Sequence, residues 1–194
     1  MSAAADLPLF PLQTVLFPGG RLPLRIFEQR YLEMAKACLR DGAAFGVCLI
    51  REGSEVGEPA LPEDVGCTAR IVEWDMPQLG VLQVVARGER RFRIRERRVQ
   101  ADGLARAAAE FLAGETDAPL DAADLCARVL RRILDAAPAG LVEAPPRYDS
   151  SAWVSARLAE LLPLSGAAKQ RLLEMDDARA RLEILRRLIS SSGK

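Results

Sequence analysis

Residues that commonly carry out chemistry are scarce in this sequence, which contains no histidine at all. Histidine is the usual proton shuttle near neutral pH, the usual base beside a nucleophilic Ser or Cys, and a common zinc ligand. Four cysteines lie among apolar neighbours and never form a Cys-x-x-Cys pair, as is typical of reduced core residues: Cys38, Cys48, Cys67 and Cys126. The sequence therefore predicts a protein that is not an enzyme, with no catalytic residue, cofactor or metal site.

An arginine-rich segment at residues 90–98 is the one concentrated charge feature. Because Phe92 and Ile94 alternate with arginines, a strand here would place four of them on one face: Arg91, Arg93, Arg95 and Arg97. Such a face could follow the phosphates of a nucleic acid. The equal totals of 27 basic and 27 acidic residues, and the absence of accompanying aromatic side chains, favour a solvated strand face with ion pairs instead. RNA or other nucleic-acid binding is therefore the alternative function.

Large apolar side chains gather at two expected corners of the chain. Trp74, Met76 and Leu79 lie between two predicted strands, which indicates a hairpin tip, and Phe17 precedes a Pro-Gly corner. Exposed apolar clusters tend to mark contacts, and Trp and Met suit a surface that accepts varied partners. These four residues are the candidate partner-binding residues. Each corner could instead pack internally, the hairpin tip against the helical half of the chain.

The elements that must position these residues fall into two halves. From about residue 6 to 112, short apolar runs are separated by Gly, Pro and charged turns, which predicts strands. One helix interrupts them, beginning near Glu28 and ending at Asp41-Gly42. The expected strands cover residues 45–51, 65–75, 80–86 and 90–99, with a hairpin turn at Arg87-Gly88-Glu89. The alanines of residues 104–112 favour a helix, but the position of this segment between turn signals favours a closing strand, which we expect.

The apolar period changes to 3.6 residues from residue 119 onward, which predicts helices. Four helices are expected, with capping residues at three of their starts: 125–134, one from Ser150 or Ser151 to Leu162, one from Ser165 to Leu173, and one from Asp176 to Ile189. We expect them to pack together and onto the sheet. The predicted domains are a β domain at 1–115 and a helical subdomain at 116–194.

Composition predicts a protein of the cytoplasm. The chain is 49% hydrophobic and 28% charged, as is typical of globular proteins. Its longest apolar runs, such as Phe45–Ile50, are too short to cross a bilayer, and the first six residues lack the features of a signal peptide. No membrane association is expected.

Several segments along the chain resemble the N-terminal substrate-recognition domain of the Lon protease family. They include Leu7-Pro-Leu-Phe-Pro-Leu12, Leu22-Pro-Leu-Arg-Ile-Phe-Glu28, Phe45-Gly-Val-Cys-Leu-Ile50, Gly88-Glu-Arg-Arg-Phe-Arg93 and Leu161-Leu-Pro-Leu164. The resemblance implies an α+β fold, in which a PUA-like β pseudobarrel with one inserted helix is followed by a C-terminal helical bundle.

The same resemblance implies a function. A full Lon protease adds an ATPase with a G-x-x-x-x-G-K-[ST] loop and a Ser-Lys peptidase, whereas the only Gly-Lys here is Gly193-Lys194. We therefore expect a stand-alone, non-catalytic recognition domain that binds exposed apolar segments of other proteins, in a substrate-recognition, adaptor or holdase role. The expected partners are unfolded or partly folded proteins and, as a further candidate, a separate Lon-like protease. The sequence leaves the oligomeric state open.

Overall fold

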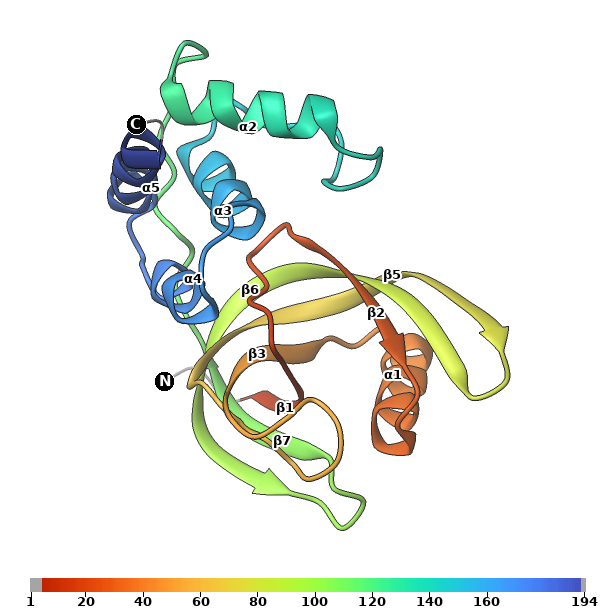
Figure 1. Cartoon of the computed structure of the whole chain (residues 1–194). Helices are drawn as coiled ribbons and strands as arrows, with labels where there is room; N and C mark the ends of the chain where they lie inside the picture. The colour runs from red at the N-terminus through yellow and green to blue at the C-terminus, as the bar shows by residue number, and fades with distance from the viewer. Residues whose placement is uncertain (1–4, 193–194) are drawn as a thin grey trace. The chain divides into compact units, whose positions relative to one another are not determined.

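A computed structural model describes residues 5–192 of the chain and divides it between Leu112 and Ala113 into two compact units (Figure 1). We call them the β unit and the helical unit. The elements of the β unit are β1 (Ala5–Leu12), β2 (Arg21–Ile26), α1 (Gln29–Asp41), β3 (Phe45–Glu52), β4 (Leu61–Pro62), β5 (Val65–Gln78), β6 (Val81–Val99) and β7 (Ala105–Phe111). Those of the helical unit are α2 (Leu125–Ala136), α3 (Ser151–Leu161), α4 (Gly166–Leu173) and α5 (Ala178–Ser192).

The strands of the β unit close into a barrel. The pairing order β1-β7-β6-β5-β3 returns to β1, because β1 also pairs in parallel with β3. The remaining two described strands lie outside this ring: β4 pairs with β3, and β2 pairs with the first half of β6. This is the predicted pseudobarrel with one inserted helix, and the predicted closing strand at 104–112 is confirmed as β7.

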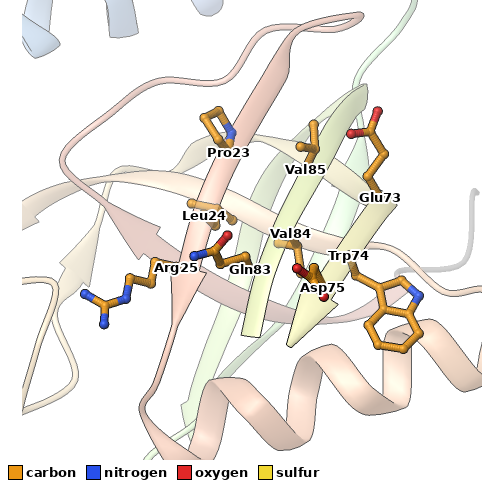
Figure 2. Close-up of a pocket in the computed structure, with 9 residues that line it drawn as sticks. All are labelled: Pro23, Leu24, Arg25, Glu73, Trp74, Asp75, Gln83, Val84 and Val85. Atoms are coloured by element: carbon orange, nitrogen blue, oxygen red, sulfur yellow. The ribbon is translucent and has the colours of Figure 1, made fainter. Parts of the chain in front are cut away.

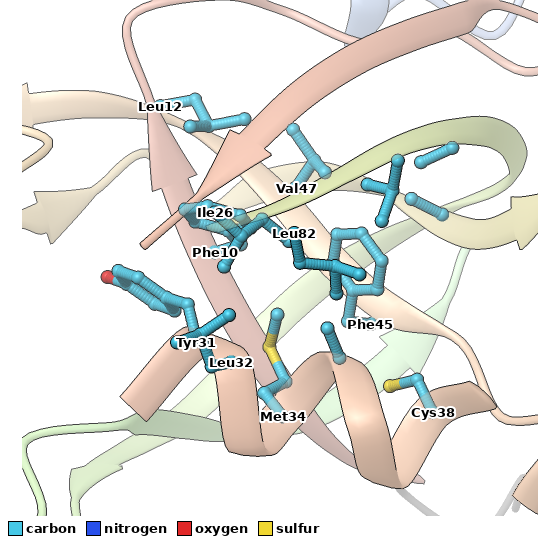
Figure 3. Close-up of a cluster of buried hydrophobic side chains, with 14 of the residues drawn as sticks. Phe10, Leu12, Ile26, Tyr31, Leu32, Met34, Cys38, Phe45, Val47 and Leu82 are labelled. Carbon is cyan, nitrogen blue, oxygen red and sulfur yellow. The ribbon is translucent and has the colours of Figure 1, made fainter. Parts of the chain in front are cut away.

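The core of the β unit lies between α1 and the barrel strands (Figure 3). Tyr31 and Met34 of α1 are buried against Phe10 and Phe45, and the rings of Phe10 and Tyr31 stack with centroids 4.2 Å apart. The three- and four-residue spacing of apolar residues in the helix thus matches one buried face. All four cysteines are buried and free, as predicted.

The predicted turn at residues 87–89 is wrong, because β6 runs unbroken from Val81 to Val99. Gly88 instead allows residues 17–20 to lie directly against β6. A Cβ there would lie 2.2 Å from the Phe17 carbonyl oxygen. The Gly19 N–H donates to the Gly88 carbonyl at 2.8 Å, and the Gly88 N–H donates to the Gly20 carbonyl at 2.9 Å. The 17–20 corner therefore packs directly on the strand, where only glycine leaves room.

Polar caps begin the helices of the helical unit. Asp124 accepts from the Cys126 N–H, Ser150 from the Trp153 N–H, and Ser165 from the Ala168 N–H. The predicted cap Asp176 is shifted by one residue, since Asp177 accepts from the N–H groups of residues 179 and 180. None of the described helices is both long and apolar enough to span a membrane.

A buried arginine joins several parts of the helical unit. The side chain of Arg181 has no solvent exposure and forms an ion pair with Glu115. Its Nε donates to the Ser155 hydroxyl at 3.0 Å, Nη1 donates to Glu115 at 2.8 Å, and Nη2 donates to the Ala152 carbonyl at 3.3 Å. These bonds connect the start of the unit with α3 and α5.

A carboxylate also holds the start of α3. Asp117 accepts hydrogen bonds from the Ser150 and Ser151 hydroxyls at 2.8 and 3.2 Å, and from the Ala152 and Ala118 N–H groups at 3.0 and 2.9 Å. Burial acts to raise the pKa of Asp117, but these four hydrogen bonds together hold it below the usual range of an aspartate. The ionised form of Asp117 therefore stabilises the folded helical unit.

We predict that Gly88→Ala lowers the free energy of unfolding by about 1–3 kcal/mol, as overpacking does, because the added methyl group collides with the backbone at Phe17. Chemical denaturation measures this. Gly114→Ala is the matched control, since a Cβ at Gly114 meets nothing within 4 Å. Equal stability of the two variants would refute the close approach.

A second prediction concerns pH. Because the folded pKa of Asp117 is depressed, its contribution is present above the unfolded value of about 3.9 and is lost as pH falls through the folded pKa. Asp117→Ala should lower the free energy of unfolding by about 1 kcal/mol at pH 7, the usual loss for a helix cap, and by less at pH 2–3. Asp135→Ala, at an exposed position of α2, is the control and should change the free energy of unfolding by less than about 0.5 kcal/mol at pH 7. A deficit in Asp117→Ala that stays constant with pH would contradict the assignment.

Candidate functional site

The hairpin of β5 and β6 carries the exposed apolar residues. β5 continues to Gln78 and β6 begins at Val81, so Trp74 and Met76 lie within a strand and not at the predicted tip. They are nevertheless exposed, at 61% and 40%, and Leu79 in the turn is 93% exposed. Val72, which the sequence did not single out, is 40% exposed. We call these four residues the hairpin surface.

The hairpin extends beyond the barrel (Figure 1). β5 pairs with β3 only at Cys67, Thr68 and Ala69, whereas its pairing with β6 continues to Gln78. The outer half of β5 therefore has β6 on one side and no described strand on the other. This geometry explains why apolar side chains of the hairpin remain in solvent, since no described strand lies beside this half of β5 to cover them.

The strand register assigns the hairpin side chains to two faces. Trp74 is opposite Val84, which is opposite Leu24, so these three share one face. Glu73 is opposite Val85 and Asp75 is opposite Gln83, on the other face. Apolar and acidic side chains thus alternate along β5.

A shallow groove of about 490 Å³ lies over the three strands β2, β6 and β5 (Figure 2). Its lining comes from three adjacent residues of each strand: Pro23, Leu24, Arg25, Gln83, Val84, Val85, Glu73, Trp74 and Asp75. Arg21 of β2 pairs with Glu73 at 2.6 Å. Figure 2 shows β6 between the other two strands, with the Trp74 indole beyond β5 on the side away from β6. The groove and the hairpin surface therefore meet at Trp74.

A second groove, of about 350 Å³, lies beside β2 and the start of α1. Phe27 and Val56 line it and are 51% and 56% exposed, while Tyr31 lies at its base and is 5% exposed. Burial raises the pKa of Tyr31, and the carboxylates of Glu28 and Glu55 raise it further while Arg30 opposes them. The phenol therefore stays protonated at neutral pH and offers a hydrogen bond rather than a charge.

The prediction that Phe17 belongs to a partner-binding surface is corrected. Phe17 is fully buried, because the corner that it begins packs on β6 at Gly88. Its size and the Pro-Gly corner after it do not distinguish a buried corner from an exposed one. That distinction depends on a strand some seventy residues later in the sequence.

The predicted arginine face is also corrected. Arg91 is only 3% exposed, so it does not belong to a solvated strand face. The register between β6 and β7 shifts between Ile94 and Glu96, and this interrupts the alternation. Arg95 donates to Glu110 at 2.5 Å and Arg97 donates to the Ala60 carbonyl at 3.1 Å. These arginines, with half-buried Arg93, do not form a single exposed track for a nucleic acid.

The four cysteines are buried and free. Burial raises the pKa of Cys126 to about 11 and also raises that of Cys48, so both thiols are protonated at neutral pH. Within residues 5–192, no group of three or more Cys, Asp or Glu side chains is arranged to hold a metal ion.

Comparison with known proteins matches this chain to the substrate-binding domain of Lon proteases. The model of the ATP-dependent protease La (LON) substrate-binding domain matches residues 6–191. Lon protease 2 of Myxococcus xanthus is 28% identical over 193 residues, a match that covers 95% of this chain and 23% of the relative. Lon protease of Anaeromyxobacter dehalogenans is 26% identical over 196 residues, covering 96% of this chain and 23% of that protein. The chain thus spans about a quarter of the length of these curated relatives.

A solved structure with the same fold covers nearly the whole chain. The crystal structure of a Lon N-terminal domain protein from Xanthomonas campestris is 41% identical, with a TM-score of 0.76, and the match covers 93% of this chain and 96% of that one. The N-terminal domain of Mycobacterium avium complex Lon protease has a TM-score of 0.60 at 18% identity, covering 93% of this chain and 96% of that chain, and shows the fold alone.

We predict that the hairpin surface contributes little to stability. Leu79→Ala should change the free energy of unfolding by less than about 0.5 kcal/mol, because the side chain is exposed. Phe17→Ala should lower it by about 3–5 kcal/mol, the usual loss for a buried phenylalanine. Denaturant titration of both variants measures the contrast. A strongly destabilised Leu79→Ala would mean that the turn is covered.

Proposed function

We propose that this chain, which belongs to the family of LON substrate-binding domains, binds unfolded or partly folded proteins through the hairpin surface. The family match confirms the resemblance noted in the sequence. The single observation that carries this proposal is the exposure of Trp74, Met76 and Leu79 on a hairpin that extends beyond the barrel. Protein substrate recognition is the function that the family description implies.

The composition of the hairpin surface suits partners of varied sequence. A tryptophan offers a large contact area with only two side-chain torsions to restrict, and a methionine adapts its shape to the partner. Contacts of this kind recognise apolar character and not a particular sequence. The neighbouring groove of about 490 Å³ adds polar groups, so a partner segment can bury apolar side chains while its backbone stays hydrogen-bonded.

Holding, without a chemical step, is the role that we propose. The three thiols with raised pKa values, those of Cys38, Cys48 and Cys126, are buried and stay protonated at neutral pH. A domain that holds apolar segments prevents their association in the manner of a holdase. As an adaptor, it would deliver the same segments to a separate Lon-like protease, which would supply the ATPase and the peptidase.

We predict that the double variant Trp74→Ala/Met76→Ala weakens capture of an unfolded model protein by about tenfold or more, because truncating anchor side chains of this kind costs 1 kcal/mol or more each. Reduced, carboxymethylated lactalbumin is the probe, and fluorescence anisotropy of its labelled form measures the dissociation constant.

The matched control is Val99→Ala, which truncates another exposed apolar residue, 48% exposed, at the other end of β6. It should bind the probe like the unaltered protein. Unchanged capture by the double variant, with a native unfolding transition, would refute the site.

A further inference from the structure

The outer half of β5 presents an unpaired strand edge next to the hairpin surface. The last residue of β5 that pairs with β3 is Ala69, and beyond it no described strand pairs with this edge of β5. The opposite edge pairs with β6. Backbone N–H and C=O groups on an unpaired edge can accept an added strand from another chain.

Side chains along this edge alternate between an apolar and an acidic face. Trp74 lies on the face of Val84, while Glu73 and Asp75 lie on the opposite face. A strand added beside β5 would alternate in the same way, since successive side chains of any strand point to opposite faces. Its residues would therefore meet the indole on one face and carboxylates on the other.

The outer residues of the hairpin carry only negative charge, while Arg21 and Arg25 of β2 lie on the same face as these carboxylates, on the far side of β6. Residues 72–83 contain no lysine or arginine, and their only charged residues are Glu73 and Asp75. Arg21 pairs with Glu73, whose side chain is still 60% exposed. Asp75 accepts a hydrogen bond from the Met76 N–H at 2.8 Å and forms no ion pair within residues 5–192. Strand edges are often guarded by a lysine, which this edge lacks. Opposite charges placed across from one another on neighbouring strands attract.

We infer that the β5 edge binds an extended polypeptide segment in which apolar side chains alternate with lysine or arginine. The apolar side chains lie on the Trp74 face and the basic side chains lie beside Asp75 and Glu73. This inference rests on the proposed function, because it names the class of segment that the hairpin surface holds.

The length of the bound segment follows from the irregularities of β5. The register with β6 shifts between Ile71 and Glu73 and again between Asp75 and Gln78. Pro77 has no N–H to donate. The regular edge is therefore centred on Trp74, and strand addition extends over about three to five residues. An extended segment of seven residues is long enough to test it.

The test uses three labelled seven-residue peptides with blocked ends and the same Phe and Val residues at alternate positions. The intervening positions are all Lys, all Ser or all Glu. Fluorescence anisotropy at 50 mM salt should show the Lys peptide binding about three- to tenfold more tightly than the Ser peptide, and the Glu peptide more weakly than both. At 0.5 M salt the three affinities should converge, since exposed charges are screened.

Two variants assign the preference to the edge. Asp75→Asn should reduce the ratio of Lys-peptide to Glu-peptide affinity several-fold. Glu96→Gln, which removes an exposed carboxylate from the second half of β6, should leave the ratio unchanged. Backbone pairing has its own signature, because only alternate N–H groups of an added strand face β5. N-methylation of one alternate set should abolish binding of the Lys peptide, and methylation of the other set should preserve it.

The outcomes separate this inference from the proposed function. Equal affinities of the three peptides, or tolerance of both methylation patterns, would overturn the inference while Trp74-dependent capture of the unfolded probe would still support the function. Absence of binding by all three peptides would also overturn it. Capture of the unfolded probe that is independent of Trp74 and Met76 would instead refute the proposed function.

Discussion

The double pairing of β1 closes the barrel, and the rest of the β unit depends on this closure. Leu9 to Leu12 pair in parallel with β3, and Ala5 to Pro8 pair antiparallel with β7. Because a parallel pair needs a crossover connection, the helix α1 lies between β1 and β3 in the sequence and covers the core. The closed ring is tight inside: a Cβ at Gly46 would lie 2.6 Å from the Phe92 ring.

Closure also determines where an unpaired edge remains. Each strand of the ring pairs with a neighbour on both sides, so its backbone groups are not available to pair with other chains. β5 is longer than the ring requires, so its outer half leaves the barrel with β6 as its only strand neighbour among the described residues. The extra length of β5 therefore explains both the exposed indole of Trp74 and the unpaired backbone edge beside it. A surface with these properties favours aggregation unless it serves binding, which gives the proposed function its physical basis.

The helical unit depends on buried polar groups to a greater degree. Arg181 has no solvent exposure, and its guanidinium bonds to Glu115, Ser155 and the Ala152 carbonyl. Asp117 binds the first residues of α3 in a similar way. Buried charges of this kind are tolerated only when they are paired and hydrogen-bonded, so they select one arrangement of the segments that carry the partners. These hydrogen bonds join Glu115 to α5 and Asp117 to α3, although both helices follow tens of residues later in the sequence.

Local patterns in the sequence determined the helices, their capping residues and most of the strands, since spacing and capping depend on near neighbours. They also identified Trp74, Met76 and Leu79 as candidates. Tertiary structure alone decided that β6 is continuous at Gly88, that Phe17 and Arg91 are buried, and that the outer half of β5 has a free edge. Each of these outcomes depends on a segment far away in the sequence. The periodicity of a strand says which side chains share a face, but what covers that face, or pairs with that edge, is set by the closure of the barrel.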